Sequence, residues 1–189
     1  MAVASRSRRP PGALEVASRA YLRRPSLADE SEFLAAMSTS RALHRPWVQP
    51  MDAVGFRQYL ARAALPDTEA LLVCRRDDLG IAGFATLSQI FYGGLCSAMC
   101  GYAAFARSAG QGYMYEGLML TVRHAFTTLR LHRVEANIQP ANDRSRALAK
   151  RCGFVLEGFS PRYLKIGGRW RDHERWALTV EEWRSQQHR

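Results

Sequence analysis

The chain has 189 residues, a formal charge of +10 and an apolar fraction of 47%, which together fit one globular domain with a substantial core. No apolar run approaches the roughly 20 residues of a membrane span, and the cysteines and histidines show no zinc spacing, so we expect neither a membrane segment nor a metal site. We expect reduced cysteines in a cytoplasmic protein; the basic balance favours a polyanionic partner (a nucleotide-type cofactor, a ribosome or nucleic acid) or only a well-solvated surface.

The N-terminal part of the chain is rich in arginine. Residues 1–24 hold six arginines and one glutamate, so about half of the net positive charge lies there. Residues 1–15 combine arginine with serine, proline and glycine, which predicts a disordered basic segment ahead of a single domain over 16–189. Because no apolar stretch follows the basic residues, this segment lacks the pattern of a secretory signal.

The first half of the chain predicts one strand, two helices and three further strands. AYLR (20–23) is typical of a strand, and LADESEFLAAMS is typical of a helix capped by Ser26 or Asp29. HRPWVQP (44–50) predicts a loop because it holds two prolines, and Asp52 is a candidate cap for a second helix. Strands are predicted at 70–75, 81–90 and 96–105, with turns at 77–80 and at Gly93-Gly94.

The second half predicts a helix over 115–129, a strand over 132–139, a short helix and a hairpin. Asn142 or Asp143 caps the short helix and Gly153 ends it. The strands of the hairpin, 155–166 and 169–179, meet at Gly167-Gly168. This order predicts an α/β (α+β) fold whose sheet is mixed but mostly antiparallel.

The loop 107–112, RSAGQG, lies between a predicted strand and the long helix. It is not a P-loop, because no Lys-Ser/Thr follows Gly112, and it fits a dinucleotide fingerprint poorly, because Tyr115 stands where the third glycine is due. Successive amides of such a turn and the N-terminus of the following helix together form an anion site. The alternative is a plain tight turn.

Three blocks in this order resemble the GNAT superfamily of N-acetyltransferases. Arg107-Ser108-Ala109-Gly110-Gln111-Gly112 resembles its acyl-CoA signature, and ANDRSRALAKRCGFVLEGF resembles its second block. The tail RYLKIGGRWRDHERWAL looks like the closing hairpin of the branch that acetylates the N-terminal alanine of ribosomal proteins. The resemblance covers about residues 20–183. It implies a central sheet flanked by helices, with a splayed cofactor groove between the strand at 96–104 and the strand at 133–139.

The resemblance also implies where acetyl-CoA is held. The amides of Arg107, Ser108, Ala109, Gly110, Gln111 and Gly112 would take its pyrophosphate. Backbone N–H groups near Tyr102 and Ala103 would meet the pantetheine arm and the thioester carbonyl, where one would steady the oxyanion. Asn142 matches the position that bonds the pantetheine amide, although it is also a helix cap. Ser145 would meet the cofactor or only occupy the first turn of its helix.

The sequence departs from the family pattern at the acid for the thiolate. Ala149 stands five residues before the Phe of Gly-Phe, where many members carry a tyrosine. Ser145 and Tyr163 are the candidate replacements. Because a thiolate is a fair leaving group, a dedicated acid is not strictly needed.

For the general base we favour Glu157, which the branch resemblance places beside the acceptor pocket. Asn137 shares a strand face with Glu135 and is a candidate water relay. Glu135 itself fits a structural hydrogen bond better than catalysis, and Glu116 fits the helix dipole.

The acceptor pocket is expected between the 40–60 segment and the final hairpin. Its candidate walls are His44, Arg45, Pro46, Trp47 and Trp170, although Trp47 is equally typical of a core anchor.

The sequence therefore predicts an acetyl-CoA-dependent N-acetyltransferase that transfers the acetyl group directly to a primary amine. The leading acceptor is the N-terminal α-amine of a protein, of ribosomal-protein type, with possible ribosome association and a monomeric or homodimeric state. The alternatives are acetylation of a small amine (a polyamine or an antibiotic), a non-catalytic acyl-CoA-binding module and an RNA- or ribosome-binding protein.

Overall fold

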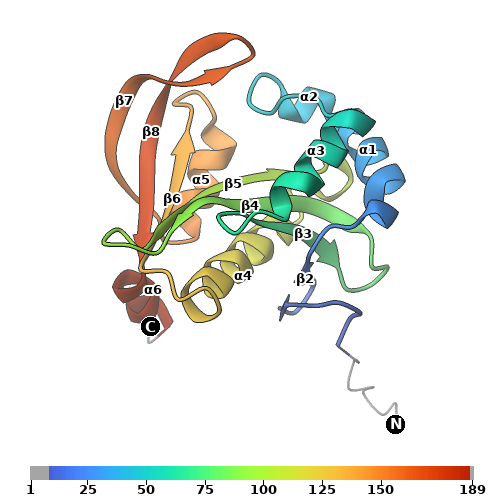
Figure 1. The fold of residues 1–189 in the computed structure, drawn as a ribbon, viewed down its shortest axis with the longest axis horizontal. Coiled ribbons are helices and arrows are strands. Elements are labelled where there is room, and N and C mark those ends of the chain that lie inside the picture. Colours follow the sequence, from blue (N-terminus) through green and yellow to red (C-terminus); the bar gives the residue numbers. More distant parts are fainter. Residues whose placement is uncertain (1–8, 188–189) are drawn as a thin grey trace.

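The computed structural model describes residues 9–187, which form one eight-stranded sheet with helices on both faces (Figure 1). The strand order is β1-β2-β3-β4-β5-β6-β8-β7. The strands are β1 (Glu15–Val16), β2 (Ala20–Arg23), β3 (Glu69–Arg75), β4 (Ile81–Phe91), β5 (Ser97–Ala104), β6 (Arg133–Ile138), β7 (Val155–Ile166) and β8 (Arg169–Thr179). The helices are η1 (Leu27–Asp29), α1 (Glu30–Thr39), α2 (Arg41–His44), α3 (Ala53–Ala63), η2 (Ala106–Ser108), α4 (Tyr113–Thr127), α5 (Asp143–Arg151) and α6 (Val180–Gln187).

Strand β3 lies in the core and sends alternate side chains to opposite faces of the sheet. Leu72 and Cys74 pack with the aromatic cluster beneath α1 and α3, which contains Phe33 and Phe56. Leu71 and Val73, on the other face, belong to the cluster under α4. Every residue of β3 is buried, which is the pattern of a strand covered on both sides.

The sheet opens between β5 and β6, the only parallel neighbours among the described strands. The two strands pair from Ser97↔Arg133 to Met99↔Glu135 and no further. Beyond that point β5 continues beside β4, and β6 continues beside β8 to Ile138. The strands therefore diverge toward their C-terminal ends, which confirms the predicted fold class and the predicted position of the splayed groove.

The predicted boundary between the N-terminal segment and the domain needs a correction. The amide of Leu14 donates to the carbonyl of Leu22, and Glu15 pairs with Leu22 in β1. The predicted disordered segment, residues 1–15, is therefore too long, since residues 14 and 15 pair with the sheet. Residues 1–8 lie outside the described residues.

Most predicted elements are confirmed within one or two residues, and the hairpin strands match the prediction at both ends. Helix α6 was not predicted, and β1 was not predicted either. Within residues 9–187, no helix combines the length and the apolar character that a membrane crossing requires.

Candidate active site

The glycine loop ends β5 and opens α4. Gly110 and Gly112 have φ values of +75° and +86°, a region that disfavours any residue with a Cβ. Gly112 is the N-cap of α4. The N–H groups of Gly110 and Gly112 meet no hydrogen-bond acceptor among the described residues, and the first-turn N–H groups of α4 lack intrahelical acceptors. The loop thus presents free donors and the positive end of a helix dipole, as an anion site needs.

Some residues of the glycine loop line the groove, and others form contacts outside it that hold the loop in place. Ser108, Ala109, Gly110 and Gly112 line the groove, whereas Arg107 and Gln111 do not. Instead, Arg107 pairs with Asp78 at 3.2 Å, and the Gln111 side chain donates to the carbonyl of Arg107 at 2.7 Å. The prediction that all six loop amides take the pyrophosphate also needs a correction, because the amides of Ser108, Ala109 and Gln111 already donate to carbonyl oxygens within the segment 105–108.

A buried arginine holds the loop against the turn between β3 and β4. Arg75 donates to Oγ of Ser108 at 3.0 Å and to the carboxylate of Asp78 at 2.7 and 2.8 Å. The hydrogen bonds from Arg75 lower the pKa of Asp78 to about 2. The hydroxyl of Ser108 is thereby engaged with protein, so its predicted role in the cofactor site rests on its position in the lining alone.

The free edge of β5 supplies the next part of the groove. The amide of Phe105 donates to the carbonyl of Ala82, which makes these two residues a hydrogen-bonded pair of the antiparallel ladder. Because such pairs alternate, Ala103 also directs its N–H toward β4, while Tyr102 and Ala104 direct theirs into the gap. The expectation for Tyr102 fits this geometry. The expectation for the Ala103 amide is wrong by one residue: the N–H of Ala103 points to β4, and the N–H of Ala104 points into the gap. Ala103 still lines the groove.

Helix α5 forms the opposite wall. Oδ1 of Asn142 accepts from the amide of Ser145 at 3.2 Å, so Asn142 is the N-cap, and it also lines the groove. Oγ of Ser145 donates to the Tyr102 hydroxyl at 2.9 Å, which in turn donates to the carbonyl of Ser145 at 3.0 Å. Burial raises the pKa of Tyr102 well above its ordinary range, so the phenol stays neutral. These hydrogen bonds connect β5 to α5, the two walls of the groove.

The groove has a volume of about 960 Å³ and combines residues from three distant segments. At one end, the Arg151 guanidinium lies 4.1 Å from the centre of the Tyr115 ring, in a cation–π contact between α5 and α4. His44, Arg45 and Trp47 also line the groove, so the 40–60 segment reaches the site as predicted. Free loop amides, nearby arginines and this volume fit an acyl-CoA, whose phosphates need donors and whose arm needs an extended slot.

The predicted base, Glu157, is not in the groove. Its carboxylate forms a two-pronged ion pair with Arg133 at the N-terminal end of β6, opposite the groove. This pairing lowers the pKa of Glu157. The prediction that Glu157 lies beside the acceptor pocket is wrong in this structure, because an arginine on the neighbouring part of the sheet binds the carboxylate.

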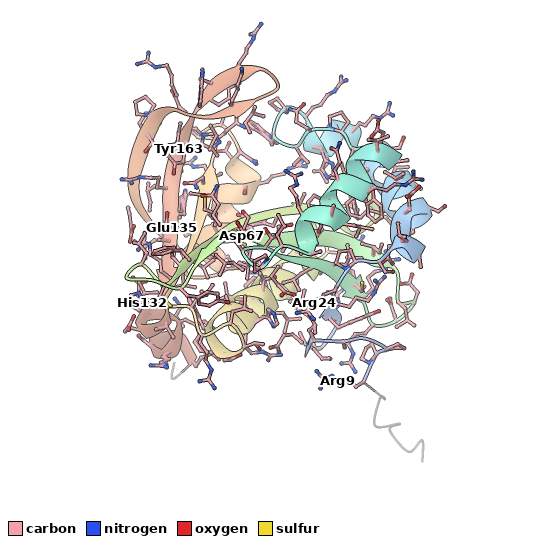
Figure 2. All side chains as sticks on the ribbon, in the orientation of Figure 1. Arg9, Arg24, Asp67, His132, Glu135 and Tyr163 are labelled. Atoms are coloured by element: carbon pink, nitrogen blue, oxygen red, sulfur yellow. The ribbon has the colours of Figure 1, made fainter. Side chains whose placement is uncertain are left out.

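Asn137, Glu135 and Tyr163 also do not line the groove. Asn137 donates to Sδ of Met99 at 3.6 Å, and its Oδ1 is buried without a hydrogen-bond partner in residues 9–187. Glu135 pairs with Arg133, as a structural role predicts. Figure 2 shows Tyr163 on the hairpin and Glu135 far from it, toward His132. The water relay through Asn137 thus has no contact with the groove to support it.

Other predicted positions have structural roles. Ala149 is fully buried and presents no group to the groove. The carboxylate of Glu116 accepts from Ser18, Arg19 and Ala20 and so anchors β2 on α4. Trp170, a candidate wall of the acceptor pocket, is 60% exposed on the hairpin and lies outside the lining.

Residues 19–155 match a family model described as an acetyltransferase (GNAT) domain. The ribosomal protein uS5-alanine N-acetyltransferase of Escherichia coli (strain K12) is 38% identical over 107 residues, which make up 57% of this chain and 55% of that protein. The probable N-acetyltransferase YjcK of Bacillus subtilis is 38% identical over 98 residues, 52% of this chain and 54% of that protein. The chain thus spans about half the length of the curated relatives it matches.

Two solved structures illustrate the likeness of fold. Mycobacterium smegmatis RimJ in complex with CoA-disulfide superposes with a TM-score of 0.78 at 28% identity, covering 86% of this chain and 83% of that one. Spermidine N-acetyltransferase from Vibrio cholerae, in complex with CoA and spermine, has a TM-score of 0.74 at 20% identity, covering 87% and 97%. At the second identity the likeness concerns the fold alone.

Proposed function

The chain belongs to the GNAT family of acetyltransferases, and from this premise we propose that it transfers an acetyl group from acetyl-CoA to the N-terminal α-amine of a protein. The observation that carries the proposal is the groove itself. It joins the free amides of the glycine loop to the free edge of β5 and continues to His44 and Trp47. One groove therefore brings together an anion site, a polar strand edge and the side chains of His44 and Trp47.

Within this proposal, the glycine loop and the start of α4 hold the pyrophosphate, and Asn142 holds the pantetheine arm. The N–H groups of Tyr102 and Ala104 face the thioester carbonyl, where preorganised donors stabilise developing negative charge. Acetyl-CoA supplies the activated acetyl group; the chain supplies position, donors and exclusion of competing acceptors.

The charge of the groove favours a peptide over a polyamine. Among its described lining residues, Asp143 is the single carboxylate, and that side chain is 86% exposed and paired with Arg146. Arg45 stands at the acceptor end. A polyamine carries several positive charges and requires carboxylates, whereas a peptide N-terminus brings one. The likeness to the E. coli uS5-alanine enzyme and to M. smegmatis RimJ supports a ribosomal protein as the acceptor.

Competition between acceptors tests the proposal. The purified protein is mixed with acetyl-CoA, a peptide starting with alanine, the same peptide with a blocked N-terminus and an internal lysine, and spermidine, and products are read by mass spectrometry. We expect acetylation of the free α-amine at least about tenfold faster than of either other amine. Preference for spermidine would favour the small-amine alternative, and acetyl-CoA binding without turnover of any amine would favour the binding-module alternative.

A further inference from the structure

One histidine lies in the groove with a defined tautomer. His44 ends α2 and is 5% exposed, and its Nε2 lies 2.8 Å from the carbonyl oxygen of Ala104. A carbonyl oxygen only accepts hydrogen bonds, so Nε2 carries the proton. In the neutral ring, Nδ1 is then an unprotonated nitrogen with an available lone pair.

Nδ1 of His44 is free to meet a ligand. It makes no hydrogen bond with any residue from 9 to 187, and it is not among the fully buried atoms that lack partners. The side chain lines the groove, unlike those of His124, His132 and His173. Of the histidines that the structure describes, His44 is therefore the one with an accessible basic nitrogen in the site.

The ring is held in place from two sides. Oγ of Ser40, at the start of α2, accepts from the amide of Ala106 at 2.8 Å, so the two ends of this short helix are bonded to the last residue of β5 and to the segment just after it. The ring centre of Phe105 lies 6.1 Å from that of His44. A base that is fixed in this way loses little freedom when an acceptor arrives.

His44 lies next to the free edge of β5. In a β-strand, the N–H and C=O of one residue point to the same side, so the Ala104 amide that faces the gap belongs to the residue whose carbonyl binds His44. The imidazole therefore lies beside the amides to which the thioester carbonyl is assigned. An amine that attacks this carbonyl arrives next to the histidine.

We propose that His44 is the general base of the acetyl transfer, with Nδ1 taking a proton from the acceptor's α-ammonium group. This inference rests on the proposed function. The freed amine forms the new C–N bond as the C–S bond of the thioester breaks, and the second amine proton ends on the departing thiolate. His44 returns its proton to solvent through the open groove, so the sum is an amide, a free thiol and one proton.

The other groups around the groove do not compete for this role. Asp143 is exposed and paired, and Glu157 lies at the far end of the sheet. Histidine is the side chain whose ordinary pKa suits proton transfer near neutrality. The other titratable or charged residues that line the groove with His44 are Arg45, Tyr102, Tyr115, Asp143, Arg144 and Arg151.

The first test reads the tautomer without any turnover. Nitrogen-15 NMR of the imidazole rings distinguishes Nε2–H from Nδ1–H, and His44 is assigned by comparison with His44→Gln. We expect the Nε2–H tautomer at pH 8, in the protein alone and with CoA bound. An Nδ1–H tautomer would remove the basic lone pair and overturn the proposal.

The second test compares His44→Gln with the matched control His132→Gln, whose imidazole pairs with Glu181 outside the groove. Gln keeps a donor for the Ala104 carbonyl but has no basic nitrogen. We expect kcat/KM at pH 7.5 to fall on the order of 100-fold in His44→Gln, with an unchanged CoA affinity by calorimetry and an unchanged control. In the plot of kcat/KM against pH, the low-pH limb of His44→Gln should shift up toward the pKa of the free α-amine, about 8, because only unprotonated acceptor then reacts.

The outcomes distinguish a different role for His44 from a different acceptor. If the wild type acetylates the peptide and His44→Gln does so equally well with the same low-pH limb, His44 is not the base and the proposed function stands. If the wild type prefers spermidine, the proposed function fails, and the same pair of variants is compared on that amine. A loss of kcat/KM that follows a loss of CoA affinity or of folding would assign His44 a structural role and contradict the proposal.

Discussion

Individual residues acquire their roles here from partners that lie far away in the chain. Glu157 fits a general base until Arg133, 24 residues away, is seen to bind it from the neighbouring part of the sheet. The phase of β5 decides in the same way that Ala104, and not Ala103, offers its amide to the groove. Neither strand register nor strand phase can be read from composition, so both errors concern pairing and not residue type.

Replacing Glu157 with Gln tests the first of these corrections. Because Glu157 lies outside the groove, we expect kcat/KM to stay within about twofold of wild type. The folded state lowers the pKa of this carboxyl, so its stabilisation is present above the ordinary pKa of glutamate and is lost as the pH falls below it. The free energies of unfolding in urea should therefore differ between the two proteins at pH 7, and the difference should shrink as the pH falls below the ordinary pKa of glutamate and through the lowered one. A folded variant without activity would restore Glu157 to the site.

The hydroxyl pair between Tyr102 and Ser145 is a second residue-scale test. Tyr102→Phe removes both hydrogen bonds between the walls and should reduce the free energy of unfolding by about 1 kcal/mol, with a weaker affinity for CoA. A double-mutant cycle with Ser145→Ala isolates the pair. Additive effects of the two changes would mean that the hydroxyls do not support one another.

Helix boundaries and the hairpin turn were predicted best, because caps and glycines are signals within a few residues of the feature. Asn142 caps α5, Gly153 ends it with φ of +89°, and the hairpin turns at Gly167-Gly168. Each of these is a short-range feature of backbone chemistry. Helix α6 also has a local signal, which the prediction missed: Thr179 and Glu182 bond reciprocally as a capping box at its start. Tertiary contact adds to it, since the Trp183 ring lies 5.6 Å from that of Phe126.

The contact between α4 and β3 gives an element-scale prediction. A Cβ at Gly117 would lie 2.6 Å from two carbons of Val73, so the helix is as close to the sheet as a glycine permits. Alanine ordinarily favours a helix, yet we expect Gly117→Ala to reduce the free energy of unfolding by about 1–3 kcal/mol. Gly101→Ala, where a Cβ meets nothing within 4 Å, is the control and should change it little. A more stable Gly117→Ala would show that this contact is looser than described.

At the scale of the whole molecule, the site exists because the sheet divides. Strands β1–β5 and β6–β8 pair only at the base of β5 and β6, and α2, the glycine loop and α5 gather at the opening (Figure 1). The order of elements and the three sequence blocks predicted this arrangement. They did not predict His44 as more than a pocket wall, because its tautomer depends on a carbonyl 60 residues away.

Calorimetric titration of acetyl-CoA into wild type, Gly110→Asp and Gly168→Asp tests whether the groove binds acetyl-CoA through the glycine loop. Both glycines have positive φ and open space for a side chain, so backbone strain is matched, but only Gly110 lines the groove. We predict that the carboxylate at 110 repels the pyrophosphate and weakens binding at least about 100-fold, while Gly168→Asp binds as wild type does. Equal affinities in the three folded proteins would leave Gly110 as an ordinary turn residue and contradict the assignment of the groove to acetyl-CoA.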